Sequence, residues 1–388
     1  MWRIDEYRGK TGLEQLEVGW KQLYATMDNR SYYHAYEAHH AYLSHLCAEP
    51  ASARYLVLME DEHVRAICPL QAGHDTILGR TVRAWTLPLH PHWQITDVIA
   101  PDGEARRMLI PAVTSFLRKR QERRRLLVLG RLPQVSSLWE GLRGMGPTRC
   151  YVQTHIPSNI FDCTQPYDEL MGRLSKNFRR NLRARWNKLQ SLKDVRFVTA
   201  FGPDGIEDEL KAFMTVEASG WKGRDGTASA IKLHPDLTAF YHDIATTMYG
   251  DEDRCEINSL YAEGHCLASQ FCIRTGDEYA IVKIGYDETF AKIGPGHLLF
   301  NRTLQRCCED ATIRCLDVLS DAPWFKDWRT TKVPMQQAHV AIGCLSGRPW
   351  ITALNFRHGP ARRIVHMVRN CIARWRAPSD VGSGAGAS

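Results

Sequence analysis

The sequence lacks the features that would place a protein in a membrane or outside the cell. No run of about 18 consecutive apolar residues occurs, so we expect no membrane-spanning helix. The first residues contain acids and no apolar core, which is unlike a secretory signal peptide. We therefore expect a cytoplasmic location.

Short-spaced cysteine pairs are also missing. The chain has 12 cysteines, but none form a Cys-x-x-Cys pair, and the adjacent Cys307 and Cys308 fall in a helical pattern. Structural zinc sites usually take four thiolate or imidazole ligands from such pairs. We expect no metal site, and we expect free, mostly buried thiols in a reducing compartment.

The sequence does have a globular composition with unevenly placed charge. Of 388 residues, 44% are hydrophobic and 24% are charged, which favours two folded domains over disorder. The net charge is +7, and residues 173–188 contain lysines and arginines without one acid. Residues 118–125 form a second basic run. Such clusters attract polyanions, but they are equally typical of a solvated helix face.

The pattern of expected elements repeats along the chain. Strands are predicted at 54–60 and 64–71, with a further extended stretch at 81–87, a strand at 95–99 and a helix over 104–123. The second half repeats this order, with strands at 256–262, 266–274, 278–286 and 313–319 and a helix that ends near residue 311. A long helix with a basic outer face is expected from residue 168 to residue 189. The repeated order predicts two copies of one α/β unit.

We expect four segments along the chain. The first copy of the unit should span residues 1–148 and the second residues 149–345. A basic helical segment should follow at 346–377, and the tail 378–388 has too few apolar residues to fold.

The turn at residues 291–299 is the sharpest candidate site. It follows a predicted strand and leads directly into a helix. Its small residues would let a ligand approach the backbone closely, and the N–H groups at the helix start would be free to donate hydrogen bonds to it. This combination binds pyrophosphate, although a plain helix-start loop has the same composition. The candidate donor-binding residues are Lys292, Ile293, Gly294, Gly296, His297 and Leu298.

A strand meander, a glycine turn, a helix and a strand in this order resemble the GNAT acyltransferase fold. In that family a Gln/Arg-x-x-Gly-x-Gly/Ala turn holds the pyrophosphate of acyl-coenzyme A. Gly294 and Gly296 match the two small positions, whereas Ala291 stands at the Gln/Arg position.

The chain resembles more closely a cellulose-biosynthesis-associated acetyltransferase-like branch of this superfamily, which is related to the Fem-type aminoacyltransferases. Three segments carry the resemblance: the basic helix 174–183, the Glu-x-x-x-Trp-Lys-Gly segment from Glu217, and the Asp317 to Trp328 stretch. The resemblance implies an α/β (α+β) fold with tandem GNAT-like domains, each a mixed, mostly antiparallel sheet flanked by helices. The first half lacks a matching glycine turn, so we expect it to bind no coenzyme and to form one wall of the acceptor cleft.

The resemblance also implies a reaction and its residues. The protein would be an N-acyltransferase that uses acyl-coenzyme A and no metal, with the thioester between strands 278–286 and 313–319. Glu217 and Asp317 are the candidate catalytic bases; a helix-end salt bridge and a loop-fixing contact, respectively, are the structural alternatives. The candidate substrate-binding residues are Trp221, Lys222, Gln270, Lys283 and Lys326.

Other donors and partners stay open at this stage. The leading acceptor is a small-molecule or sugar amine, but a carrier protein or an aminoacyl-tRNA could supply the acyl group, which the basic helix would favour. A non-catalytic nucleic-acid-binding protein is the third interpretation, although the basic clusters lack interleaved aromatics. Residues 360–376 interleave arginines with apolar residues, which suits either peripheral membrane contact or packing on the protein itself.

Overall fold

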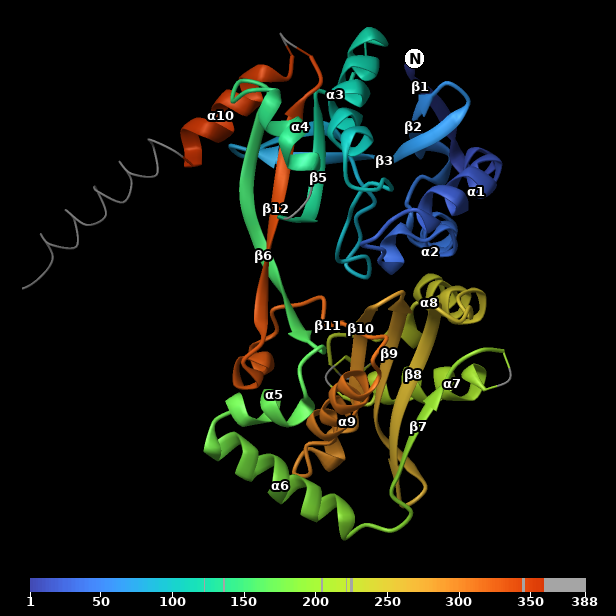
Figure 1. Cartoon of the computed structure of the whole chain (residues 1–388), viewed down its shortest axis with the longest axis vertical. Coiled ribbons are helices and arrows are strands. Elements are labelled where there is room, and N and C mark those ends of the chain that lie inside the picture. Colours follow the sequence, from blue (N-terminus) through green and yellow to red (C-terminus); the bar gives the residue numbers. More distant parts are fainter. Residues whose placement is uncertain are drawn as a thin grey trace, which may run out of the picture.

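The computed structural model describes residues 1–121, 123–134, 137–203, 205–220, 222–223, 226–343 and 346–358. Two lobes lie one above the other along the long axis of the molecule, and the strands β6 (Cys150–Asp162) and β12 (Thr331–Ala341) run from one lobe to the other (Figure 1). The segments predicted at 360–376 and 378–388 lie outside the described residues, and the domain boundaries stay predictions.

The described residues contain one sheet in the order β1-β2-β3-β4-β5-β12-β6-β11-β10-β9-β8-β7. Its other strands are β1 (Trp2–Arg8), β2 (Arg54–Glu60), β3 (His63–Ile77), β4 (Arg80–Thr86), β5 (Leu126–Pro133), β7 (Arg196–Ala200), β8 (Asp253–Ala262), β9 (His265–Thr275), β10 (Glu278–Tyr286) and β11 (Cys315–Asp317). Neighbouring strands are antiparallel except for β4 with β5 and β10 with β11. Each half thus contains one parallel pair in the same place, which confirms the predicted tandem GNAT-like, mostly antiparallel architecture.

Helices flank this sheet on both faces. They are α1 (Gly9–Ala25), α2 (Tyr36–Ala41), α3 (Glu104–Lys119), α4 (Leu138–Gly144), α5 (Tyr167–Arg173), α6 (Lys176–Gln190), α7 (Ile206–Glu217), α8 (Pro235–Thr247), α9 (Pro295–Glu309) and α10 (Arg348–His358). Short helical turns are η1 (Tyr32–His34), η2 (Tyr42–Leu46), η3 (Pro50–Ser52), η4 (Ile231–Leu233), η5 (Glu288–Phe290) and η6 (Pro323–Trp328).

The structure corrects two expectations and adds one strand that was not predicted. Residues 95–99 form no strand, because Ile99 makes only an isolated bridge with Ile67. The helix expected from 168 to 189 is interrupted at Leu174, because the Ser175 side chain caps a new helix by accepting a hydrogen bond from the Phe178 N–H at 3.1 Å. The sequence analysis also missed β12, whose partner β5 lies in the other half of the chain.

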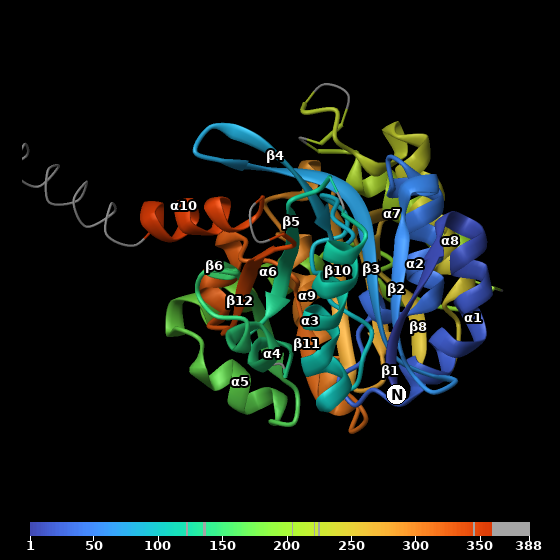
Figure 2. The ribbon, with the colours of Figure 1, turned by 90° about the horizontal axis from the view of Figure 1, so that it is seen from above.

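The apolar core joins the two lobes. In the first lobe, alternate residues of β2 face α1 and α2 on one side and α3 and α4 on the other (Figure 2). The cluster under α1 and α2 continues into α7 and α8 of the second lobe. Figure 1 shows α2 and α8 facing each other where the lobes meet. This packing brings the loop after β4 next to the second lobe.

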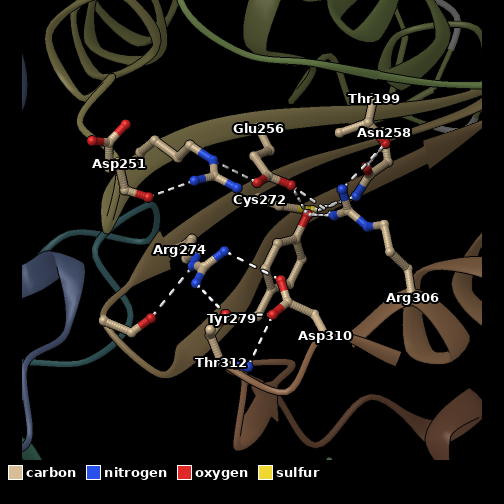
Figure 3. A network of polar contacts seen from close by, with 12 residues as sticks. Thr199, Asp251, Glu256, Asn258, Cys272, Arg274, Tyr279, Arg306, Asp310 and Thr312 are labelled. Carbon is tan, nitrogen blue, oxygen red and sulfur yellow. Dashed lines mark hydrogen bonds and ion pairs between the residues drawn. The ribbon is translucent and has the colours of Figure 1, made fainter. Parts of the chain in front are cut away.

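A buried ion-pair network holds α9 on the sheet. Glu256 of β8 is 1% exposed and accepts hydrogen bonds from Arg254 at 2.8 Å, from Arg306 of α9 at 2.7 Å and from the Tyr279 hydroxyl at 2.9 Å (Figure 3). Burial opposes ionisation of Glu256, but the guanidinium of Arg306 holds its pKa below the usual value. The network thereby fixes the helix whose first turn contains the glycine motif.

Candidate active site

The strands β10 and β11 run side by side for three residues and then separate. Residues Glu278 to Ala280 pair with Cys315 to Asp317, and β10 continues to Tyr286 without this neighbour. Beyond Ala280, the main-chain N–H and C=O groups on this edge of β10 therefore form no ladder hydrogen bonds with β11. Fixed N–H groups at such an opening can polarise a carbonyl oxygen.

A β-bulge in β10 shifts the alternation of its side chains, so that Val282 and Lys283 face the same side of the sheet. The register with β9 shifts around Val282, and Lys283 pairs with Phe271, whose side chain belongs to the cluster under α7 and α8. Ile284 instead lines a cavity at the start of α9. The opening between β10 and β11 thus has a face toward α9 and a face toward the first lobe.

The turn before α9 has the backbone expected of an anion-binding helix start. Gly294 adopts φ 67° and ψ 52°, a left-handed conformation that glycine reaches without strain. Pro295 takes the first helical position, where an N–H is not required. Among the described residues, the Gly296 N–H has no hydrogen-bond partner. This turn therefore offers a free donor and the positive end of the helix dipole.

A cavity of about 290 Å³ opens at this turn. The residues that shape it are Arg185, Tyr286, Gly294, Gly296, His297 and Trp324. Three larger cavities, of about 310, 600 and 890 Å³, lie elsewhere in the described structure, and none of them is lined by a residue of the turn at 291–299. Chemistry rather than size therefore makes the smaller cavity the candidate anion site.

Arg185 is a site residue that sequence reasoning missed. It projects from α6 so closely to Gly294 that a Cβ added there would lie 2.8 Å from its Nε atom. Its Nη1 is buried and has no hydrogen-bond partner in the part of the chain that the structure describes, whereas Arg183 on the same helix is exposed. Arg185 brings a cation to the turn where the family motif has Gln or Arg and this chain has Ala291. That departure was the available signal that a cation had to come from another element.

His297 adds an uncharged donor to the same cavity. The indole Nε1–H of Trp328 donates to its Nδ1 at 3.3 Å, so the neutral ring carries its proton on Nε2. Burial, and then the nearby charge of Arg185, lowers the pKa of His297 to about 4. At neutral pH the ring therefore provides one N–H and no charge.

A second cavity, of about 170 Å³, occupies the opening between β10 and β11. It shares Ile284 and Trp324 with the first cavity, so the two adjoin. On the face toward the first lobe it is lined by Lys222, Lys283 and Gln94, the last from the loop after β4. The first lobe therefore contributes a wall to this cavity.

Glu217 lies at the end of α7 and is 4% exposed. One of its carboxylate oxygens accepts a hydrogen bond from Lys222 Nζ at 2.9 Å, and the other accepts from the Ile231 N–H at 2.9 Å. Its main chain packs against Gly285 of β10, where a Cβ would come within 2.7 Å of the Glu217 Cα. This contact holds the end of α7 against the strand that forms the opening.

Asp317 lies at the end of β11 on the other side of the strand pair. Its Oδ1 accepts hydrogen bonds from the Ser158 hydroxyl at 2.6 Å and from the Leu319 N–H at 2.7 Å. Burial raises its pKa, and it lines a cavity of about 310 Å³ together with Glu278, whose pKa burial also raises. Asp317 does not line either of the two cavities near α9.

The other predicted residues divide between the cavities and their surroundings. Gly294, Gly296 and His297 line the first cavity, and Lys222 and Lys283 line the second. Lys292 and Lys326 are exposed outside both cavities, while Ile293 and Leu298 pack into an apolar cluster. Gln270 is fully buried, and its Oε1 accepts a hydrogen bond from Thr303 at 2.8 Å. Trp221 lies outside the described residues.

Comparison with known proteins agrees with this geometry. Residues 176–327 match the family described as the acetyltransferase (GNAT) domain. The curated proteins compared with the chain include no match. The match covers less than half of the chain, and together with the fold it supports an acyltransferase whose residues 176–327 resemble a GNAT domain.

Solved structures extend the fold likeness to most of the chain. FemX has a TM-score of 0.53 at 9% identity, with 86% of this chain and 96% of FemX covered. A conserved protein of unknown function from Bacteroides thetaiotaomicron has a TM-score of 0.53 at 11% identity, with 84% and 97% covered. The C-terminal domain of a putative lysylphosphatidylglycerol synthetase from Agrobacterium fabrum has a TM-score of 0.50 at 11% identity, with 89% and 95% covered. At such identities the likeness concerns the fold.

The described residues offer no candidate for a membrane span or a metal site. No helix there is long and apolar enough to cross a membrane. The same residues contain no group of three or more His, Cys, Asp or Glu side chains that could hold a metal ion.

The variant Arg185→Gln is expected to weaken acetyl-coenzyme A binding about 10- to 100-fold, because a charge-assisted hydrogen bond is worth about 1.5–3 kcal/mol. Arg183→Gln is the matched control, since it removes an exposed arginine from the same helix. Calorimetry of both variants measures the difference. Equal dissociation constants for the two variants would show that Arg185 does not contact the donor.

Proposed function

We propose that this protein is an N-acyltransferase that moves an acyl group from acyl-coenzyme A to an amine of a small molecule or a sugar. The observation that supports this function is the continuity of the two cavities through Ile284 and Trp324. A diphosphate bound at Gly294 and Arg185 would place the rest of the donor toward the opening between β10 and β11. The acceptor would enter from the face that Gln94 lines.

The chemistry of acyl transfer fits these positions. The amine nitrogen attacks the thioester carbon, the new C–N bond forms, and the C–S bond breaks as the thiolate leaves. Main-chain N–H groups of β10 at the opening would stabilise the oxyanion between the two steps. The amine loses a proton and the thiolate gains one.

The base for this reaction stays a prediction. Glu217 does not line the second cavity itself, but its hydrogen-bond partner Lys222 does, so its carboxylate lies one side chain away from that cavity. Asp317 would have to act across the strand pair, from the cavity that it shares with Glu278. Glu217 is therefore the better candidate of the two.

A direct experiment measures donor binding and turnover separately. Acetyl-coenzyme A, longer acyl-coenzyme A species and free coenzyme A are each tested by thermal shift, and thiol release is then followed with a panel of amines. Free coenzyme A should bind nearly as well as acetyl-coenzyme A, because the diphosphate provides the contact with α9. If none of the three compounds raised the melting temperature, the proposal would be refuted.

Acyl or aminoacyl transfer from a carrier protein or a charged tRNA is the second candidate. The observation in its favour is the outer face of α6, where Lys176, Arg179, Arg180, Arg183 and Lys188 are all exposed. Trp186 on this helix is 41% exposed and stacks on Phe197 at an interplanar angle of 15°. Such a face would suit a large polyanion.

Salt dependence is expected to distinguish the two donors. A polyanion held by several cations should lose affinity steeply with salt, by about 1000-fold or more between 50 and 200 mM if six or more phosphates are contacted. Coenzyme A in a small cavity should lose far less. Binding of acetyl-coenzyme A, an acyl carrier protein and aminoacyl-tRNA is measured over this range. If a carrier protein or an aminoacyl-tRNA supported transfer and its affinity fell steeply with salt concentration, the second candidate would be favoured.

A further inference from the structure

Lys283 is a charged residue of the opening that forms no ion pair with any residue the structure describes. The side chain is half-buried in β10, and no described residue forms a hydrogen bond or ion pair with it. The bulge at Val282 places it on the face toward the first lobe, away from Arg185 and Gly294. An uncompensated charge in such a place is costly unless a ligand pairs with it.

The groups around Lys283 do not neutralise it. Glu217 has both carboxylate oxygens engaged, by Lys222 and by the Ile231 N–H. A ring nitrogen of His92 forms a hydrogen bond with the Tyr241 hydroxyl at 3.0 Å. Burial lowers the pKa of His92 to about 3, and the charge of Lys283 is the second cause. His90 is likewise held neutral by burial and by Lys283, which lower its pKa. One positive charge therefore remains in this corner of the cavity.

Some of the other lining side chains of this cavity are hydrogen-bond donors, although most of the lining is apolar. Gln94 brings a side-chain amide from the loop after β4, and Lys222 brings its ammonium group from beside Glu217. A carboxylate or a phosphate monoester would accept bonds from all three side chains. A neutral or cationic group at this position would leave Lys283 unpaired.

We propose that Lys283, together with Lys222 and Gln94, binds an anionic group of the acceptor, so that the acceptor is an amine that also carries a carboxylate or a phosphate. This inference rests on the proposed acyl transfer and names the class of its acceptor. Pairing with Lys283 holds the acceptor on the face of β10 opposite the donor diphosphate. The amine of the same molecule then lies at the opening, where the acyl carbon arrives.

The test uses protection of Lys283 from a neutral amine-reactive reagent, with labelling followed by peptide mass spectrometry. N-acetylglycine and N-acetylglycinamide are a matched pair of probes that differ in the carboxylate, and inorganic phosphate forms a separate arm. N-acetylglycine or phosphate at about ten times its dissociation constant should slow Lys283 labelling about tenfold. N-acetylglycinamide should not slow it, and the exposed Lys10 serves as the reference in every sample. Equal labelling of Lys283 with the charged and the neutral probes would overturn the proposal.

The pH dependence of protection gives a second readout. Burial, followed by the charge of Lys222, lowers the pKa of Lys283 to about 8, with an opposing contribution from Glu217. Lys283 is charged below this pH and neutral above it, so protection by anions should be present near pH 7 and disappear as the pH rises beyond about 8. Protection that persists at about pH 10 would contradict a charge-based contact.

Donor binding separates failure of this inference from failure of the proposed function. Lys283→Met should leave acetyl-coenzyme A affinity within about twofold, because the donor lies on the other face. A large loss would assign Lys283 to the donor and overturn the acceptor role. Wild-type protein that fails to bind acetyl-coenzyme A would refute the proposed function, whereas the protection result would still decide whether Lys283 is an anion site. The variant Asp225→Asn removes an acid that is close in sequence to Lys222. If anions protected Lys283 from labelling only in this variant, the proposal would also be overturned.

Discussion

Replacing Gly296 by aspartate is expected to lower acetyl-coenzyme A affinity roughly a thousandfold, with little loss of stability. Two like charges about 4 Å apart repel by about 4 kcal/mol at an effective dielectric constant near 20, and this energy corresponds to about three powers of ten in affinity. An acid in the first turn of a helix is favourable for the helix itself. Calorimetry with acetyl-coenzyme A measures the affinity, and the melting temperature reports on the fold.

Gly296→Ala is the matched control because it adds bulk without charge. A Cβ at this position would lie 3.6 Å from Tyr286 Cδ1 and 3.9 Å from Ile284 Cδ1, which are ordinary contacts. The alanine variant should therefore keep most of its donor affinity. If the aspartate variant bound acetyl-coenzyme A as tightly as the alanine variant, the diphosphate would have to lie somewhere other than the start of α9.

Glu256→Ala should produce the largest loss of stability, about 3–5 kcal/mol. Removing one partner of a buried ion pair leaves the other charges without compensation, here the guanidinium groups of Arg306 and Arg254. Because the pKa of Glu256 in the folded protein lies below the usual value of 4.5, its stabilisation is present at neutral pH and is lost as the pH falls through this range. Denaturant unfolding at neutral and at acidic pH measures the difference from the wild type.

Glu62→Ala is the control for this prediction. Glu62 is exposed and forms only a surface ion pair with Arg3 at 3.4 Å, so its removal should change stability by about 0.5 kcal/mol or less. The stability of Glu256→Gln should lie between that of the wild type and that of Glu256→Ala, because the amide keeps one acceptor oxygen for Tyr279 and Arg306 but loses the charge. A Glu256→Ala variant as stable as Glu62→Ala would show that the network contributes no net stability.

Local pattern was sufficient for much of the fold. Polar turns flanked by β-favouring residues predicted β2 and β10 with the bounds that the structure has, because hairpin turns and strand alternation are encoded by neighbouring residues. The helix α9 and the glycine turn at its start were also predicted from neighbouring residues alone. The strand β12 did not, since its pairing with β5 joins residues about 200 positions apart, and nothing near Thr331–Ala341 marks the partner.

The candidate site divides in the same way. The turn at Gly294 and Gly296 is one short segment, so its backbone and its place before a helix could be predicted from residue type and order, while its role as an anion site stays a prediction. Arg185 lies about 110 positions away in the chain, and only the packing of α6 against the start of α9 brings it to that turn. Periodicity distinguishes a buried from an exposed face of α6, but it does not say which of several arginines meets a cavity.

The sequence by itself determined that this protein is built from two related α/β units and that its second unit presents a glycine turn at a helix start. These features depend on contacts between residues close in the chain, and residue type and spacing are enough to specify them. Tertiary structure alone decided that Arg185 lies at the turn that follows Ala291, that a bulge turns Lys283 away from this turn, and that Gln94 of the first lobe lines the opening in the second. Each of these depends on two distant segments meeting in space, and their meeting is set by the packing of the whole chain.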